Sequence, residues 1–175
     1  MRPALLLVLV LLAGCAFRPS LPYVLQPAAT GPACFANQEV VFRRPGGETE
    51  RLLTTVENDG RHLSIVASSP MGQTLFVLRT EGGKATLDAR VPLPESFDPN
   101  LLPALIQLSD WPLEEARKGL APGMELREEG PLRTLLRRGK TLLTLDRRGP
   151  APPYRTIHLR VPPMDLEATI TTLDE

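Results

Sequence analysis

Short runs in which apolar and polar residues alternate, separated by turn residues, make up most of the chain after Phe35. An alternation with a period of two is typical of a strand that has one face on the core and the other in water. The clearest run is 85–91, and the turn Asn58-Asp59-Gly60 ends an earlier run with residues that tolerate a positive φ. The pattern predicts an antiparallel meander of five strands, at residues 38–44, 49–57, 62–68, 73–80 and 85–91.

A helical pattern replaces the strands between residues 92 and 123. Leucines there recur at the spacing of one helix face. A helix start at Asn100 places Pro103 in the first turn, where a missing amide hydrogen costs no bond. A second short helix is predicted from Pro112, and Pro122 with the glycine after it ends the pair. The two helices are expected either to pack on the sheet as core or to cover a cavity as a lid.

The strand pattern returns after residue 124. Five more strands are predicted, at residues 125–128, 132–138, 140–147, 155–161 and 166–173. The chain is therefore expected to be mainly β, with ten strands and one helical insertion.

One predicted strand is apolar on both faces. Phe76 and Leu78 lie on one side of it, and Leu75 and Val77 lie on the other. A strand of an antiparallel sheet with water on one side should alternate apolar and polar residues. The second face of this strand therefore needs a cover, which helices, a second sheet or an apolar ligand would supply.

The first residues have the features of a secretion signal. Arg2 is positively charged, and residues 4–12 are purely apolar but too few to span a bilayer, which takes about 20 helical residues. The run Leu12-Ala13-Gly14-Cys15 resembles the lipobox of bacterial lipoproteins. The resemblance implies a signal peptide at residues 1–14 and acyl chains, such as palmitate, on Cys15. The alternative is an ordinary secretory signal in which Cys15 is incidental.

Residues 15–34 are rich in Pro and Ala, so they are expected to be an extended tether, followed by the β domain at residues 35–175. The alternative for this segment is a first edge segment packed on the domain. Ala16, and not Asp, follows Cys15. By the sorting rule of enteric-type lipoproteins, this residue favours the outer membrane, with the domain facing the periplasm. Several acyl chains would hold the protein there stably.

The composition excludes several function classes. Lys and Arg number 20, as do Asp and Glu, so no basic excess points to a nucleic-acid partner. Aromatic residues make up 5% of the chain, which argues against extended base-stacking or sugar-stacking surfaces. About 160 residues would remain after removal of the signal peptide, the size of one domain. If Cys15 is lipidated, Cys34 has no intramolecular partner and is expected to be a buried thiol.

The sequence contains no catalytic or metal-binding pattern. His62 and His158 lack the spacing and the Cys or carboxylate neighbours of a zinc site. Ser68-Ser69 lacks the flanking glycines of a nucleophile elbow. We therefore expect no enzyme activity, no metal and no cofactor. Arginine pairs at strand ends are interpreted as solvated charge or, alternatively, as contacts to anionic lipid headgroups; they are Arg43-Arg44, Arg137-Arg138 and Arg147-Arg148.

The segment Ser69-Pro70-Met71-Gly72-Gln73-Thr74-Leu75, followed by an apolar strand, a Gly-Gly turn and Lys84-Ala85-Thr86-Leu87, resembles the middle of LolB-type outer-membrane lipoproteins. The order of anchor, meander, Leu-rich helix pair and returning strands is also that of the LolA/LolB fold. The resemblance implies a curved antiparallel half-barrel, with a two-helix lid inserted after the fifth strand. LolB-type receptors use an exposed apolar residue on a loop between early strands, whereas loops 45–48 and 58–61 are polar here.

The segment Leu105-Ile106-Gln107-Leu108-Ser109-Asp110-Trp111-Pro112-Leu113 resembles a second group. These are uncharacterised Gram-negative lipoproteins that are often encoded beside aryl-polyene or fatty-acid-type biosynthesis genes. Gly123-Met124-Glu125-Leu126 and Arg133-Thr134-Leu135 fit the same group. This group brings no established activity with it.

Both resemblances lead to one expectation, an outer-membrane-anchored lipoprotein that binds an apolar ligand (acyl, lipid or polyene-like) in a half-barrel cavity for envelope transport or localisation. Its partners would be the membrane, through Cys15, the ligand or acylated product, and envelope transport proteins. The alternative is a filled core in a non-enzymatic, tethered partner of an envelope assembly. The expected cavity wall comprises Phe76, Leu78, Leu101, Leu105, Leu108 and Trp111.

Overall fold

The computed structural model describes residues 21–43, 49–93, 95, 97–150 and 152–173. Ten antiparallel strands in these residues form one sheet, in the order β5-β4-β3-β2-β1-β10-β9-β8-β7-β6. The strands are β1 (Cys34–Arg43), β2 (Thr49–Asn58), β3 (Leu63–Ser68), β4 (Thr74–Glu81), β5 (Lys84–Ala89), β6 (Met124–Glu129), β7 (Leu132–Arg137), β8 (Lys140–Arg148), β9 (Thr156–Val161) and β10 (Leu166–Thr172).

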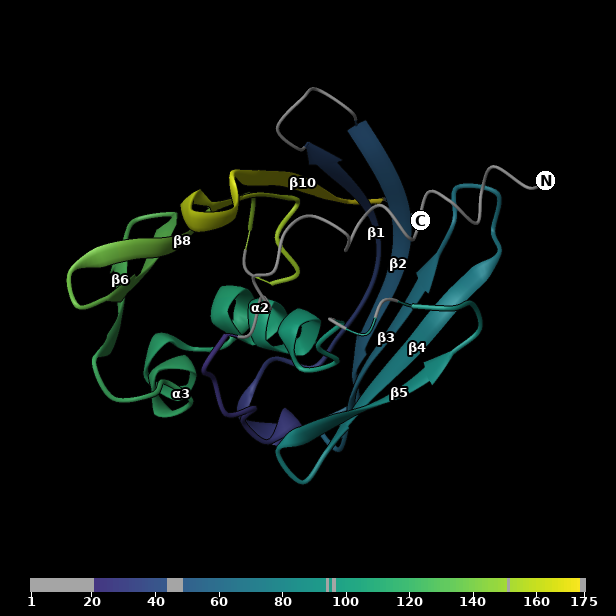
Figure 1. Cartoon of the computed structure of the whole chain (residues 1–175). Helices are drawn as coiled ribbons and strands as arrows, with labels where there is room; N and C mark the ends of the chain where they lie inside the picture. The colour runs from purple at the N-terminus through teal and green to yellow at the C-terminus, as the bar shows by residue number, and fades with distance from the viewer. Residues whose placement is uncertain (1–20, 44–48, 94, 96, 151, 174–175) are drawn as a thin grey trace.

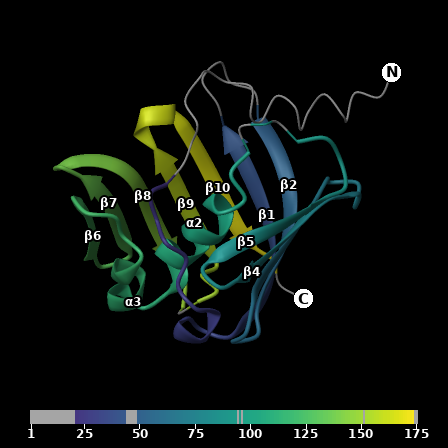
Figure 2. The same cartoon turned by 60° about the horizontal axis from the view of Figure 1, so that its bottom comes forward.

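The sheet is open and bends around a concave side, where α2 (Leu101–Asp110) lies (Figure 1). The shorter α3 (Leu113–Lys118) lies beside β6 (Figure 2). The mainly β, half-barrel fold with a helix pair after the fifth strand is therefore confirmed. Two short 3-10 helices, η1 (Ala28–Thr30) and η2 (Pro162–Met164), complete the elements.

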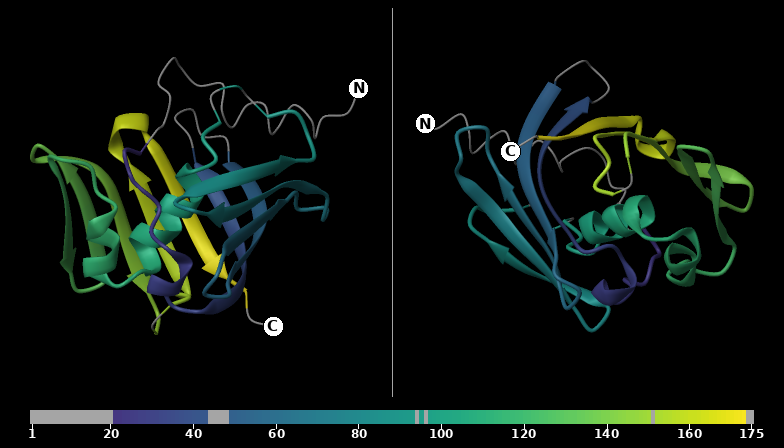
Figure 3. Two further views of the ribbon diagram at one scale, coloured as in Figure 1. Left: turned by 90° about the horizontal axis from the view of Figure 1, so that it is seen from below. Right: turned by 180° about the vertical axis from the view of Figure 1, so that it is seen from behind.

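The connections explain why the helices cover the concave side. Consecutive strands are neighbours within β1–β5 and within β6–β10, and the pair β1–β10 joins the two halves at the centre of the sheet. The ends of these halves, β5 and β6, are consequently the two free edges. The chain between them must cross from one edge to the other, and it does so over the concave face with α2 and α3 (Figure 3).

Two apolar clusters fill the space between sheet and helices. The larger lies under α2 and α3 and includes Leu108 and Trp111 together with strands β6–β10. The smaller lies against β3 and β4 and includes Ile65 and Phe76. Ile106 of α2 packs against both clusters, so this helix is the element that joins them.

The described part of the expected tether is packed on the domain, which corrects the boundary drawn at residue 35. Tyr23 and Leu25 are buried in the larger cluster. The Val24 amide donates to the Gly119 carbonyl oxygen at 2.8 Å, and Tyr23 forms a β-bridge with Leu120. The apolar residues at every second position from Leu21 to Leu25 supply this packing. The tether is predicted from the Pro and Ala content of the segment, which does not register such an alternation. These residues therefore match the alternative expectation, a first edge segment packed on the domain. The first strand, β1, begins at Cys34 and not at the predicted residue 38.

Candidate functional site

The C-terminal end of α2 is held by two buried arginines of the sheet. The Arg133 Nη1 donates to the carbonyl oxygens of Leu108 and Ser109, at 2.9 and 3.0 Å. The Arg147 Nη1 donates to the Ser109 oxygen at 3.0 Å. The last carbonyls of a helix lack partners within the helix, and a buried one left unpaired is costly. These arginines therefore fix the helix end to β7 and β8.

One carboxylate joins the two arginines. The Glu128 Oε2 accepts from Arg133 Nε at 2.6 Å and from Arg147 Nη2 at 2.7 Å. Burial alone would raise the pKa of Glu128, but these two ion pairs outweigh it and lower the pKa. The Arg147 guanidinium also lies 4.9 Å from the centre of the Tyr154 ring. We call Glu128, Arg133 and Arg147 the arginine clasp.

A second carboxylate, one oxygen of which has no hydrogen-bond partner among the described residues, lies at the same helix end. Asp110 is buried, and its Oδ1 accepts no hydrogen bond. Desolvation raises the pKa of Asp110 to about 6, although Ser109, Arg133 and Arg147 act to lower it. Burial raises the pKa of the Cys34 thiol, and the nearby Asp110 charge raises it further. Cys34 is thus a free, half-buried thiol in an environment that keeps its proton on, which disfavours nucleophilic chemistry.

The N-terminal segment is hydrogen-bonded to the end of α2 and to the residue that follows it. The Gln107 side chain donates to the Gln26 carbonyl oxygen at 2.9 Å and accepts from the Gln26 amide at 2.8 Å. The Trp111 Nε1 donates to the Thr30 hydroxyl at 3.1 Å. At Gly31, an added Cβ would lie 2.2 Å from the Trp111 ring. This close approach explains why a glycine is needed there.

The six residues expected to wall a cavity fall into two groups. Phe76 and Leu78 lie in the smaller cluster, whereas Leu108 and Trp111 lie in the larger one. Leu78, Leu108 and Trp111 each have 0% exposed surface. A side chain with no water-accessible surface borders no open space, so these three are packed core in this conformation. The remaining two, Leu101 and Leu105, are half-buried on α2.

Five apolar side chains that pack on the smaller cluster were not among the predicted site residues. Val91, Leu93 and Phe97 pack on it from the segment between β5 and α2, and Leu102 and Ile106 pack on it from α2. The Phe97 ring meets the Phe76 ring edge-on, with 5.2 Å between the ring centres. Apart from α2, this cover is irregular backbone. We call residues 91–93 and 97–106 the cover.

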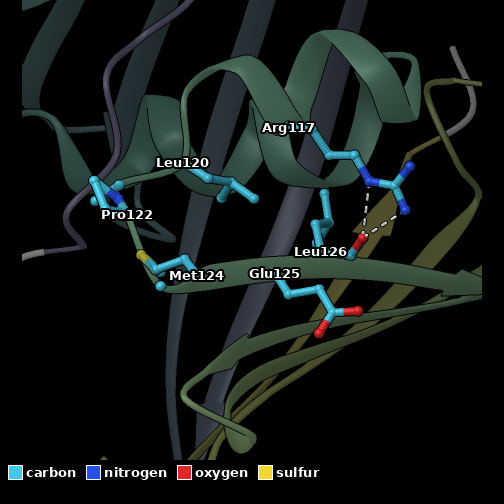
Figure 4. A pocket seen from close by; sticks show the side chains of 8 residues that line it. Arg117, Leu120, Pro122, Met124, Glu125 and Leu126 are labelled. Atoms are coloured by element: carbon cyan, nitrogen blue, oxygen red, sulfur yellow. Dashed lines mark hydrogen bonds between the residues drawn. The ribbon is translucent and has the colours of Figure 1, made fainter.

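A surface pocket of about 370 Å³ lies between α3 and β6 (Figure 4). Arg117 crosses it, and its Nε and Nη2 donate to the Leu126 carbonyl oxygen at 3.1 and 3.0 Å. The Glu125 carboxylate in its wall pairs with Arg127. The Arg117 bonds tie α3 to one backbone carbonyl of β6, and the lining residues hold no nucleophile or paired acid and base. The pocket is therefore a consequence of how α3 docks.

The histidines lie apart from any metal-ligand cluster. The His62 Nδ1 lies 3.0 Å from the Thr80 carbonyl oxygen, and the His158 Nδ1 lies 3.2 Å from the Thr169 hydroxyl. Among the described residues, no three His, Cys, Asp or Glu side chains gather as metal ligands. In the same part of the chain, no helix is both long and apolar enough to cross a membrane.

Met71 is a feature that sequence reasoning passed over. It lies in the turn between β3 and β4 and is 83% exposed, the most among the exposed large apolar side chains of the described residues. Loops 45–48 and 58–61, also between early strands, are polar, and the apolar turn residue lies in neither of them. Apolar character at the tip of a Pro-Met-Gly turn was the available signal.

Comparison with known proteins places the chain in a family. Residues 36–174 match the family described as protein of unknown function, DUF3261. The chain belongs to the DUF3261 family. The match begins at the third residue of β1 and covers the other nine strands in full, and therefore the clasp and the cover as well. No curated protein matches the chain.

Proposed function

We propose that this DUF3261 protein is a lipid-anchored envelope protein that binds one apolar chain, acyl or polyene-like, against β2–β4 beneath the cover. In this proposal, Cys15 carries the anchor and the outer membrane is the site of action. The domain holds its ligand by apolar burial and needs no covalent chemistry, at about 25 cal/mol per Å² removed from water.

The observation that carries the proposal is the separate apolar cluster under irregular backbone. Five apolar side chains of the cover pack on β3 and β4, and three of them come from the segment before α2. An irregular segment has no ladder of hydrogen bonds to break when it moves. An apolar chain is well suited to take the places of Leu93 and Phe97 against Phe76, because the strand behind them is apolar.

The asymmetric fixing of α2 supports the same proposal. Its C-terminal end is held by Arg133 and Arg147, and its own Gln107 is bonded to the Gln26 backbone. Near its N-terminal end, the Asn100 Oδ1 accepts from the Ala85 amide at 2.9 Å. This single bond to the edge strand β5 holds the N-terminal end more weakly than the two buried arginines hold the other end. The cover would therefore open at residues 97–102 while the larger cluster stays packed.

The exposed Met71 supports delivery to a membrane. LolB-type receptors, which the sequence resembles around this turn, use an exposed apolar residue on a loop between early strands. Met71 offers such a side chain on the β3–β4 turn. An apolar side chain at a turn tip suits insertion among lipid headgroups.

A filled interior favours a second candidate function, a non-enzymatic, tethered partner of an envelope assembly. The observation behind it is the lack of exposed surface on Leu78, Leu108 and Trp111. Under this alternative, the cover stays closed and the outer surface of the domain is what binds.

Binding of cis-parinaric acid, a fluorescent polyene fatty acid, separates the two candidates. The carrier function predicts saturable binding of one probe per domain, with faster hydrogen exchange at residues 97–102 and unchanged exchange at residues 107–110. Leu52, half-buried on β2 against the smaller cluster, is the wall position to change. Leu52→Asn should weaken binding about tenfold, because it places an unpaired amide against the ligand.

Leu132→Asn is the matched control, since Leu132 is an exposed leucine of β7. It should leave the affinity unchanged. Absence of saturable binding, or equal weakening by both variants, would overturn the carrier proposal in favour of the tethered partner.

A further inference from the structure

The turn between β7 and β8 carries three positive charges without a carboxylate partner. Arg137, Arg138 and Lys140 surround Gly139, and all three charged side chains are exposed. None of the three forms an ion pair within the part of the chain that the structure describes. Arg137 stands directly opposite Lys140 in the strand register. Like charges placed opposite one another destabilise a hairpin. We call Arg137, Arg138 and Lys140 the basic turn.

The backbone of this turn makes the arginine at its tip more notable. Arg138 has a φ of 50°, and Gly139 has a φ of 77°. A two-residue hairpin turn with positive φ at both positions favours Asn or Gly at its first position. The chain has an arginine there instead, at a conformational cost.

The opposite end of the sheet has a different charge pattern. Its basic residues stand beside acidic ones: Lys84 faces Glu81 across the β4–β5 turn, and Arg61 lies two residues from Asp59. The basic turn is thus distinguished by unbalanced charge and not by the mere presence of arginine.

The chain enters the described domain next to the basic turn. The Ala121 amide donates to the Pro22 carbonyl oxygen at 3.2 Å, and the Arg138 amide donates to the Gly123 carbonyl oxygen at 3.0 Å. Pro22 and Arg138 are therefore both hydrogen-bonded to the short segment 121–123, one at each end of it. From there the N-terminal segment runs along α3 and α2 toward η1 (Figure 3).

The length of chain before that point limits how far the basic turn can lie from an anchor. Residues 16–20 separate Cys15 from Leu21. A fully extended chain of that length spans about 20 Å. If Cys15 carries the lipid, Leu21 must stay within about that distance of the membrane. The hydrogen bonds above connect the adjacent Pro22, through residues 121–123, to the basic turn.

We propose that the basic turn is a docking surface for anionic lipid headgroups, which holds the domain on the membrane with this end of the sheet facing the bilayer. The inference rests on the proposed lipid anchor at Cys15 and adds an orientation to it. Each basic residue near an anionic surface strengthens the attraction about fivefold. The cover and the concave side would then lie to the side of the docked domain, open to an incoming ligand.

The lysines of the chain allow a direct test, because Lys140 lies in the basic turn, Lys84 lies at the opposite end and Lys118 lies on α3. The full-length lipidated protein is placed in vesicles of phosphatidylcholine with or without phosphatidylglycerol. Acetylation of each lysine is then followed by mass spectrometry. We expect the labelling rate of Lys140, relative to Lys84, to fall about fivefold on anionic vesicles and to recover in high salt.

A pair of matched variants links the protection to the charge. Arg137→Ser with Arg138→Ser should remove most of the protection of Lys140. Arg61→Ser with Arg79→Ser removes two exposed charges from the other end of the sheet and should leave the protection intact. A labelling ratio that is equal on both kinds of vesicle, or protection of Lys84 instead, would overturn the docking surface.

Flotation of the same vesicles keeps this inference separate from the proposed anchor. Protein that floats with vesicles but shows equal labelling overturns the orientation and leaves the anchor standing. Protein that does not float overturns the anchor and, with it, the distance limit on which the docking surface rests.

Discussion

At the residue scale, single side chains decide how closely α2 and the N-terminal segment approach each other. Gly31 lies against the Trp111 ring, where an added Cβ would come within 2.2 Å. The ring is fully buried and donates to Thr30, so it has no room to move away. This contact holds the N-terminal segment against the centre of the core, although the composition of that segment predicts a tether.

We predict that Gly31→Ala lowers the free energy of unfolding by about 1–3 kcal/mol, the usual cost of overpacking a core. Urea unfolding followed by Trp111 fluorescence measures it. Ala29→Ser, an exposed change two residues away, is the control and should stay within about 0.5 kcal/mol of the native chain. Equal stability of Gly31→Ala and the native chain would mean that the segment is not packed on the ring.

Asp110 gives a prediction with a pH dependence. Its pKa is raised to about 6, from 3.8, so between these values the folded state binds more protons than the unfolded state. The contribution of Asp110 to stability therefore falls as the pH rises from about 4 to above 6. Asp110→Asn removes this loss. The free energy of unfolding of the variant minus that of the native chain should therefore be about 3 kcal/mol higher at pH 8 than at pH 4.

The measurement is the free energy of unfolding of both chains between pH 4 and pH 8. Subtracting one from the other cancels the contributions of titratable groups that both chains share, such as Glu128. Glu128 acts in the opposite direction, because its pKa is lowered and its contribution is lost at low pH. A difference between the two chains that does not vary with pH would contradict the buried, charged state of Asp110.

At the element scale, α2 is positioned by the arginine clasp. Removing one member of a buried, hydrogen-bonded charge group leaves the others without compensation and costs about 3–5 kcal/mol. We predict a loss of this size for Arg147→Met, together with faster hydrogen exchange at the C-terminal turn of α2. Arg137→Met changes an exposed, unpaired arginine on β7 and should cost less than about 0.5 kcal/mol.

The two arginines share Glu128, so their effects should not add. The loss for Arg133→Met with Arg147→Met should differ from the sum of the single losses by more than about 0.5 kcal/mol. Additive losses, or unchanged exchange in α2, would show that the clasp does not hold the helix.

The elements themselves could largely be predicted from the sequence, because alternation and turn residues are local signals. The runs 62–68 and 85–91 correspond closely to β3 and β5, and the leucine spacing located α2. The clasp could not be predicted, because Arg133 and Arg147 are separated by 14 positions and meet α2 only through the register of β7 and β8. The irregular part of the cover, before α2, escaped prediction because it has no periodicity. A cavity was expected from the sequence, but packing density is not a sequence signal, so the sequence could not tell that Leu78, Leu108 and Trp111 are packed as core.

At the scale of the whole molecule, the proposal divides the protein into an anchor and a domain that holds an apolar chain. The two cysteines test the first part. We predict that Cys15→Ser moves the protein from the membrane fraction to the soluble fraction, whereas Cys34→Ser leaves it on the membrane, because only Cys15 follows the lipobox. Fractionation of cells that express each full-length variant measures this, and membrane retention of Cys15→Ser would contradict the anchor.

Native mass spectrometry of residues 16–175, purified without the anchor from the original host, tests the second and central part most directly. We predict a bound lipid or polyene mass, with one ligand per domain, that disappears on delipidation and returns on incubation with envelope lipids. A bare protein mass that stays unchanged after that incubation would contradict ligand binding and leave a tethered domain with a filled core.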